Sequence, residues 1–221
     1  MHQLYNYKTY IFDCDGVLLD SNSLKIKAMS EALDSERSIV SGKESAVNYF
    51  RNNFGKSRFH HVSHFCNALL EFEGNEDQVQ LSILKKYSEL CDSYYKRSKK
   101  TDGIDEFLNF IKGDFYIASG SEQNQLREII DNKFDFFLTA NVYGSPANKI
   151  DIVARIISKV SNFSSAVLIG DSLADLEAAR FNGIDFVGYL PYSNVAKELK
   201  ASCLEYDYLC IASWDEVLNW S

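Results

Sequence analysis

Two aspartates at the end of a short apolar run constrain this chain more than any other feature. The run closes with Ile11 and Phe12, and Asp13, Asp15 and Gly16 follow. Because side chains alternate along a strand, the two acids share one face, and at the strand's end they can converge on one small site. Gly16 allows a tight turn behind them that a residue with a Cβ reaches only at a cost. This arrangement suits covalent phosphoryl transfer.

The charge of a phosphate ester explains why such a pair of acids would need a metal. A phosphate monoester is a dianion, so a carboxylate that attacks it needs charge cancelled first, normally by bound Mg²⁺. Asp13 would then serve as metal ligand and nucleophile, and Asp15 would be near enough to act as an acid. Calcium loops and exposed turns also contain Asp-x-Asp-Gly, so the pattern does not decide by itself.

A second apolar run ends in a hydroxyl and a glycine. Residues 115–118 lead to Ser119 and Gly120, and a helix-like segment begins at about residue 122. A strand-to-helix turn of this kind exposes backbone N–H groups and a hydroxyl, which together bind phosphate oxygens. An ordinary N-cap serine is the alternative interpretation.

Two further segments place charged side chains near the predicted N-termini of helices. Lys149 stands in the first turn of an amphipathic segment, where the helix dipole favours acids, so its presence invites a functional reason. A buried-strand pattern over 166–170 runs into Asp171 and Asp175, which face the same side if a helix follows. A solvent-facing lysine and a capping aspartate are the alternatives.

Together the four elements resemble, in order and spacing, the motifs of the haloacid dehalogenase-like superfamily of phosphohydrolases, over the whole chain. The matching positions are Asp13 and Asp15 in the first motif, Ser119 in the second, Lys149 in the third, and Gly170, Asp171 and Asp175 in the fourth.

The resemblance implies a two-step reaction. Asp13 attacks phosphorus and forms an aspartyl-phosphate while Asp15 protonates the leaving oxygen. Asp15 then takes a proton from the water that hydrolyses the intermediate. Halide removal, the chemistry that named the family, is disfavoured because it needs neither Asp15 nor a metal.

The resemblance also implies a Mg²⁺ site and a phosphate site. The metal ligands would be Asp13, the backbone carbonyl of Asp15, Asp171, and Asp175 directly or through water. The groups that bind the phosphoryl oxygens would be Ser119, Gly120 and Lys149.

The alternation of predicted elements indicates an α/β fold. The predicted strands cover 115–119, 134–139, 165–170, 184–189 and 207–211, and the predicted helices cover 122–131, 148–160 and 172–182, with Ser213 capping a last helix. This rhythm predicts a Rossmann-like parallel sheet with helices on both faces. All four motifs then fall at or beyond the carboxyl ends of strands, where ligands bind in open sheets.

Residues 23–96 lack strand-like alternation and predict a mostly α-helical insertion, so the α/β core would comprise 1–22 and 97–221. In the resembled family, a helical cap at this point closes over the site and selects the substrate. Within it, Arg51 and Arg58 flank a glycine between aromatics, and Arg58 is suited to a carboxylate of the substrate. A surface position for both is the alternative.

Other polar and aromatic clusters have simpler interpretations. His60, His61 and His64 have no acid at the spacing of a known zinc signature, so helix surface or cap packing is expected. Ring clusters usually indicate packing, which we expect for Tyr94, Tyr95, Phe134, Phe136 and Phe137.

Composition limits the partners and the location. The net charge of −8 argues against general affinity for nucleic acid or anionic membranes.

The first eight residues lack the order of a signal peptide, and no apolar run approaches the ~18 residues of a membrane span, so a cytoplasmic location is expected. Five cysteines without a Cys-x-x-Cys pair indicate neither a disulfide framework nor a zinc site. The oligomeric state is unknown at this level.

The sequence therefore favours a Mg²⁺-dependent phosphatase of a small metabolite, such as a sugar phosphate, a sugar-acid phosphate or a phosphoglycolate-like ester. A sugar phosphomutase would use the same aspartyl-phosphate, and a catalytically weak metal- or phosphate-binding regulatory module would keep the same acids. A phosphonate-cleaving enzyme needs a cap lysine, for which the candidates are Lys43, Lys56, Lys85 and Lys86.

Overall fold

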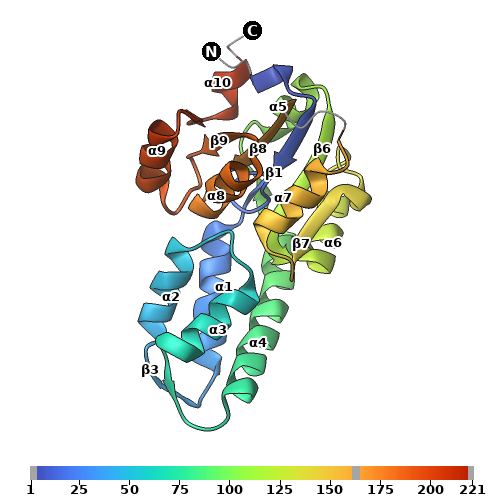
Figure 1. The fold of residues 1–221 in the computed structure, drawn as a ribbon. Helices are drawn as coiled ribbons and strands as arrows, with labels where there is room; N and C mark the ends of the chain where they lie inside the picture. Colours follow the sequence, from blue (N-terminus) through green and yellow to red (C-terminus); the bar gives the residue numbers. More distant parts are fainter. Residues whose placement is uncertain (1–3, 161–164, 219–221) are drawn as a thin grey trace.

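A six-stranded parallel sheet forms the centre of the larger lobe in the computed structural model, which describes residues 4–160 and 165–218 (Figure 1). Residues 1–3, 161–164 and 219–221 lie outside this description. The predicted core of 1–22 and 97–221 is therefore described without its first three and last three residues. The order of the strands is β10 (Leu209–Ile211), β9 (Asp185–Tyr189), β8 (Ala166–Gly170), β1 (Thr9–Phe12), β6 (Asp114–Glu122) and β7 (Val142–Ser145).

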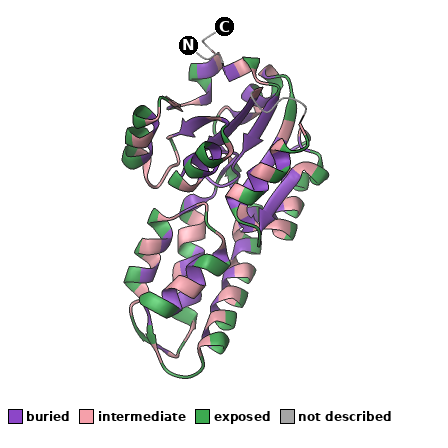
Figure 2. Cartoon of the chain, in the orientation of Figure 1, coloured by how far each residue is buried: buried purple, intermediate pink, exposed green. Residues whose placement is uncertain are grey.

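Helices cover both faces of this sheet because its side chains are apolar on both faces. Tyr10 and Phe12 of β1 belong to the hydrophobic cluster under α5 (Ile104–Phe110), α6 (Gln123–Lys133) and α10 (Trp214–Leu218). Ile11 points to the other face, against α7 (Lys149–Ile157), α8 (Leu173–Asn182) and α9 (Ala196–Glu205). Figure 2 shows the strands buried and the outer faces of these helices exposed. The predicted α/β fold class is confirmed.

The strand register brings the sequence motifs to one edge of the sheet. Phe12 is paired with Ile117 of β6 on one side and with Ile169 of β8 on the other. Asp13, Ser119 and Asp171 each follow these paired positions by one or two residues. They therefore lie at the carboxyl edge of the three central strands, as predicted.

A helical lobe, defined here as residues 22–97, lies at that carboxyl edge (Figure 1). It contains α1 (Asn22–Ser35), α2 (Lys43–Asn52), α3 (Arg58–Ala68) and α4 (Glu76–Arg97), with a short ribbon of β3 (Ile39–Ser41) and β4 (Glu71–Phe72) at its far end. The two chain crossings between the lobes, β2 (Leu19–Asp20) and β5 (Lys99–Lys100), pair in antiparallel fashion. Both connections therefore lie side by side.

The structure corrects two predictions in the larger lobe. The predicted strand over 134–139 is wrong: Phe134 and Phe137 lie in an irregular segment and pack into the core, with Phe137 against Phe12. A 3-10 turn (η2, Thr139–Asn141) follows, and the strand β7 begins only at Val142. The helix α9 was not predicted. Another 3-10 turn, η1 (Leu4–Asn6), precedes β1.

The remaining predicted boundaries differ by a few residues. The helix predicted over 148–160 ends at Ile157, and the strand predicted over 115–119 continues to Glu122. Ser213 accepts a hydrogen bond from the backbone N–H of Glu216, so the predicted cap of the last helix is confirmed. No helix within the described ranges combines the length and the apolar character that a bilayer crossing requires.

Candidate active site

Asp13 is the first residue after β1 and is buried beside a lysine. Its backbone N–H donates to the carbonyl of Ile169 in β8 (2.9 Å), which fixes its position between the strands. Its Oδ1 accepts from the backbone N–H of Cys14 (2.7 Å), and its Oδ2 lies 3.0 Å from Nζ of Lys149. Gly16 closes the turn with a φ of +80°, a conformation that favours glycine.

Lys149 stands at the first position of α7 and is held between two acids. Asn148 caps this helix by accepting from the backbone N–H of Asp151, so the start of α7 is fixed at the lysine. Nζ of Lys149 donates to Oδ1 of Asp175 as well as pairing with Asp13. Asp175 in turn accepts from the hydroxyl of Ser172 (2.5 Å) in a capping box at the start of α8.

Asp171 is the third buried acid and the least satisfied one. Its Oδ2 accepts from Nδ2 of Asn22 (2.6 Å), the first residue of the helical lobe. Its Oδ1 is buried and has no hydrogen-bond partner among the described residues. A Cβ on Gly16 would lie 2.2 Å from Asp171 Oδ2, so the turn after Asp15 has to be a glycine for the two segments to meet.

The three acids form a concentrated negative site. Asp13, Asp171 and Asp175 offer oxygens within 4.8 Å of one another, and Lys149 is the cation that pairs with two of them. Burial and the charge of Asp175 raise the pKa of Asp13 to about 7. Burial and the charge of Asp13 raise the pKa of Asp171 well above its usual value. In both cases burial is the larger cause and the charge of a neighbouring carboxylate adds to it, while Lys149 acts in the opposite direction.

Hard divalent cations prefer oxygen ligands, and this donor set fits one. The unpartnered Oδ1 of Asp171 is the specific observation that supports the fit. Among the described residues, Asp13, Asp171 and Asp175 are the acidic side chains that lie close enough together to bind one ion.

Asp15 lies in a different environment from Asp13. Its Oδ1 accepts from the hydroxyls of Ser21 (2.6 Å) and Tyr95 (2.9 Å), and its Oδ2 accepts from Nζ of Lys25 (2.8 Å) and from the hydroxyl of Ser121 (2.8 Å). Burial acts to raise the pKa of Asp15, but Lys25 and the hydroxyl donors outweigh it and hold that pKa below its usual value. Asp15 is therefore a carboxylate here.

A loop of the helical lobe lies directly on the carboxyl edge of the sheet. A Cβ on Gly120 would lie 2.7 Å from the carbonyl oxygens of Gly55 and Lys56, so the lack of a side chain lets the loop approach. Ser119, the neighbouring residue, is buried and its hydroxyl accepts from the backbone N–H of Ser121 (3.1 Å).

The loop leaves little room over the acids. The cavity between the lobes next to Asp15 has a volume of about 10 Å³, enough for roughly one water. A hollow of about 200 Å³, lined by Lys149 and Asn148 among others, lies on the other side of Gly55. A third hollow of about 310 Å³ between α4 and α6 contains none of the predicted site residues.

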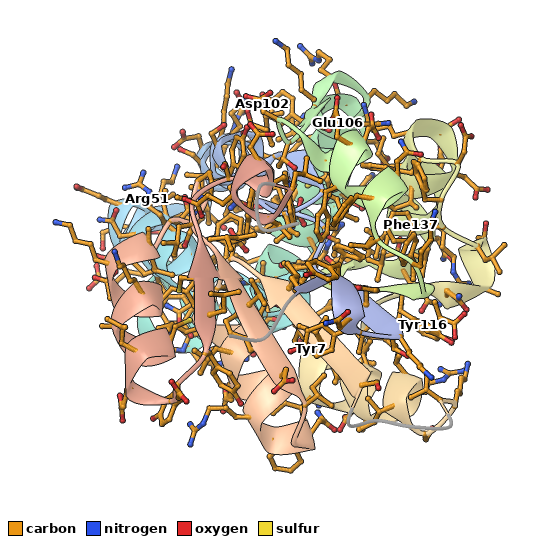
Figure 3. The ribbon with its side chains drawn as sticks, turned by 90° about the horizontal axis from the view of Figure 1, so that it is seen from above. Tyr7, Arg51, Asp102, Glu106, Tyr116 and Phe137 are labelled. Carbon is orange, nitrogen blue, oxygen red and sulfur yellow. The ribbon has the colours of Figure 1, made fainter. Side chains whose placement is uncertain are left out.

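The two predicted cap arginines have different positions. Arg58 is buried at the start of α3, where Nη1 donates to Ser88 (3.0 Å) and Nη2 to Oε1 of Gln125 on α6 (2.7 Å). It therefore connects the two lobes. Arg51 is exposed near the end of α2, on the outer side of the helical lobe (Figure 3).

The histidines and one of the tyrosines have different roles in the structure. His64 stacks on Tyr49 and His61 packs against Phe50, which agrees with the expected packing role. Tyr95 is buried as expected, but its hydroxyl also contacts Asp15, which the sequence did not indicate.

The structure therefore brings together the predicted acids, Ser119, Gly120 and Lys149 around one edge of the sheet. Sequence reasoning missed the residues that hold the acids: Asn22, Lys25, Tyr95 and Ser121. The hydroxyl spacing of Ser119 and Ser121 is the one local signal that could have suggested a second serine.

Comparison with known proteins identifies a family for this chain. The family model for haloacid dehalogenase-like hydrolases matches residues 7–183. No curated protein matches the sequence.

Solved structures share the fold over nearly the whole chain. A predicted phosphatase from Clostridium acetobutylicum has 20% identity and a TM-score of 0.72, with 96% of each chain covered. A predicted phosphoglycolate phosphatase from Haemophilus somnus has 16% identity and a TM-score of 0.73, with 98% of each chain covered. A haloacid dehalogenase-like family protein from Streptococcus pneumoniae has 20% identity and a TM-score of 0.71, covering 97% of this chain and 98% of its own.

Proposed function

The chain belongs to the haloacid dehalogenase-like hydrolases, and from this premise we propose that it is a Mg²⁺-dependent phosphatase that hydrolyses a small phosphorylated metabolite through an aspartyl-phosphate on Asp13. The observation that carries the proposal is the pair of buried aspartates in opposite environments. Asp13 lies beside Lys149 in a cluster of acids, and Asp15 lies among hydrogen-bond donors.

Asp13 is the nucleophile of the first step. One of its carboxylate oxygens bonds to phosphorus as the bond from phosphorus to the ester oxygen breaks. Nζ of Lys149, 3.0 Å from Oδ2 of Asp13, places a positive charge beside the transferring group. Ser119 and the backbone N–H of Gly120 supply further donors for the phosphoryl oxygens.

Asp15 moves the protons in both steps. It gives a proton to the leaving oxygen in the first step, and it takes one from the water that attacks the aspartyl-phosphate in the second. The second step releases phosphate and regenerates Asp13. The ionised Asp15 of this structure has the form needed to accept a proton, and protonation for the first step requires Lys25 to loosen its hold.

The acid cluster would hold the metal. The ligands would be Asp13, Asp171 and the backbone carbonyl of Asp15, with Asp175 directly or through water. Bound there, Mg²⁺ would offset the charge of the acids and of the phosphate dianion.

The helical lobe would act as a cap, with residues 23–96 as the inserted domain and 1–22 with 97–221 as the core. The loop around Gly55 covers the edge of the sheet and leaves about 10 Å³ beside Asp15, so a substrate enters only when the lobes separate. The paired connections β2 and β5 are the natural hinge. The partner would be a small phosphate ester, and the five free cysteines support a cytoplasmic location.

The test is phosphate release from a panel of sugar, sugar-acid and short organic-acid phosphates, with and without Mg²⁺. Asp13→Asn is the control, and its circular dichroism spectrum verifies the fold. We expect release that requires both the metal and Asp13. Near wild-type release by Asp13→Asn would contradict the mechanism. Transfer of phosphate between positions of a sugar without release would instead identify a phosphomutase.

A further inference from the structure

Two of the five cysteines meet at the outer end of the sheet. Cys203 lies near the end of α9, and Cys210 is the middle residue of the outermost strand, β10. The register pairs Cys210 with Gly188 of β9, and paired residues of neighbouring parallel strands direct their side chains to the same face. Cys203 belongs to the hydrophobic cluster on the face that α9 covers, and Cys210 packs against that cluster. The helix and the strand therefore bring the two thiols together.

Gly188 leaves the space that the two sulfur atoms occupy. A Cβ on Gly188 would lie 2.9 Å from Sγ of Cys210 and 3.1 Å from Sγ of Cys203, so both sulfur atoms converge on this point. Gly188 lies inside β9, where a glycine has no side chain to pack and often marks a close approach of another group. The two thiols are the groups that approach here.

The two thiols differ in acidity and in exposure. A hydrogen bond from the Cys203 thiol lowers the pKa of Cys210, and the charge of Lys200 acts in the same direction, although burial opposes both. The same hydrogen bond, together with burial, raises the pKa of Cys203. Cys203 is fully buried, whereas Cys210 is partly exposed on the edge strand. Cys210 therefore forms the more reactive thiolate, and it is the thiol that a reagent from solvent meets first.

We propose that Cys203 and Cys210 form a site of reversible oxidation, in which Cys210 reacts with a peroxide and Cys203 then closes a disulfide with it. The disulfide ties the end of α9 to β10. Neither thiol belongs to the proposed phosphoryl-transfer site, so this inference stands independently of the proposed phosphatase. In a compartment whose thiol pool is reducing, such a bond is transient and is reversed by thiol exchange.

The reaction takes place in two steps. In the first, the thiolate sulfur of Cys210 attacks one oxygen of the peroxide, the O–O bond breaks, hydroxide leaves, and the sulfur is oxidised to a sulfenic acid. In the second, the sulfur of Cys203 attacks the sulfur of Cys210, the S–O bond breaks, and the hydroxide leaves with the thiol proton as water. The two thiols are thereby oxidised to one disulfide, and the peroxide is reduced to water.

The experiment is peptide mapping of the full chain after exposure to hydrogen peroxide. The protein is then unfolded in an alkylating agent and cleaved with trypsin without reduction. Cleavage after Lys200 places Cys203 and Cys210 on one peptide, 201–221, which contains no further cysteine, lysine or arginine. A disulfide within this peptide is read as the loss of two hydrogen atoms and of both alkyl groups. Cys66 lies on a separate peptide and reports the oxidation of an unpaired cysteine.

We expect wild type to lose both alkyl groups from peptide 201–221 while the peptide that contains Cys66 stays alkylated. Treatment with a thiol reductant before alkylation should restore both groups. A peptide 201–221 that stays doubly alkylated while Cys66 is oxidised would overturn the proposal. A disulfide-linked dimer through Cys210 on a non-reducing gel, in place of the internal bond, would also overturn it.

Two variants separate the roles of the cysteines, and Cys66→Ser is the matched control that should behave as wild type. Cys203→Ser should stop at the sulfenic acid on Cys210, which dimedone traps. Cys210→Ser should leave Cys203 alkylated and without dimedone. Trapping of Cys203 in Cys210→Ser, with Cys210 unreactive in Cys203→Ser, would contradict the assignment. If thermal unfolding shows that Cys203→Ser does not fold, Cys203→Ala is used, because it places no hydroxyl in the core.

Discussion

Nζ of Lys25, on the first helix of the helical lobe, lies 2.8 Å from Oδ2 of Asp15 in the core. The ionisation of Asp15 therefore depends on a cation from the other lobe. A movement of the lobe that carried Lys25 away from Asp15 would remove one reason for the low pKa of Asp15. The position of the lobe and the protonation of the proposed acid are coupled through this ion pair and through the hydroxyl of Tyr95 on α4.

Lys25→Met should raise the pKa of Asp15, because burial then acts with one fewer opposing charge. The pKa is measured by ¹³C NMR titration of the aspartate carboxyls, with Asp15→Asn assigning the signal. Lys27→Met is the matched control, since Lys27 is exposed on the same helix and pairs with Glu31. An unchanged Asp15 pKa in Lys25→Met would show that the hydroxyls alone hold the carboxylate.

Lys149→Met should lower kcat by roughly 10²–10³, because it removes the charge aimed at the transferring group. It should also destabilise the fold by about 3–5 kcal/mol, since two buried carboxylates lose their cation. The loss, measured by urea unfolding, should be smaller at low pH, where Asp13 is protonated. Lys159→Met, an exposed lysine just after the same helix, is the control. A kcat within tenfold of wild type would contradict the role of Lys149.

The parallel sheet and the four motifs could be predicted because they depend on local patterns. Each motif ends an apolar run, and the register of β1 with β6 and β8 follows once the sheet is parallel. The pattern of 134–139 predicts a strand because Phe134 and Phe136 alternate with a polar residue. In the structure Phe134 and Phe137 are the buried rings of this segment, with Phe137 against Phe12 of β1, and the true strand β7 is short and contains Gly144. Burial alone does not distinguish these cases.

The contacts that hold the acids could not be predicted, because their partners are remote in sequence. Tyr95 reaches Asp15 across 80 residues, and Asn22 reaches Asp171 across 149. Nothing in the residues around Lys25 marks it as a partner of a carboxylate. The cations and rings around Gly55 single out Arg58 in the sequence, but its hydrogen bond to Gln125 in the other lobe depends on the folded structure.

Asp171→Asn should stabilise the metal-free protein at alkaline pH and abolish its stabilisation by Mg²⁺. Because the folded pKa of Asp171 is raised, the wild-type fold retains this proton longer than the unfolded chain, so stability declines as pH rises from the ordinary value of 3.8 through the raised one. Asparagine keeps the size and removes this decline. Thermal unfolding with chelator and with excess Mg²⁺ measures both effects. A Mg²⁺-dependent shift that survives the substitution would place the metal elsewhere.

Gly55→Ala should impair catalysis far more than it impairs folding. Gly55 has a φ of +90°, and an added Cβ would lie 2.7 Å from Oγ of Ser172 and 2.8 Å from Cβ of Ala174. Ser172 is tied to Asp175 and Ala174 is part of α8, so neither moves freely, and the loop cannot lie on the core as it does here. If closure completes the site, kcat/KM should fall by about tenfold or more.

Gly74→Ala provides the matched control for this substitution. Gly74 lies in the same lobe with a φ of +96°, but an added Cβ meets nothing within 4 Å. Both variants therefore carry the same backbone strain of about 1–2 kcal/mol, and only Gly55→Ala adds a collision with the core. Thermal unfolding should show similar losses of stability, while kcat/KM falls only in Gly55→Ala. Equal activity in the two variants would mean that seating of this loop on α8 is not required for turnover.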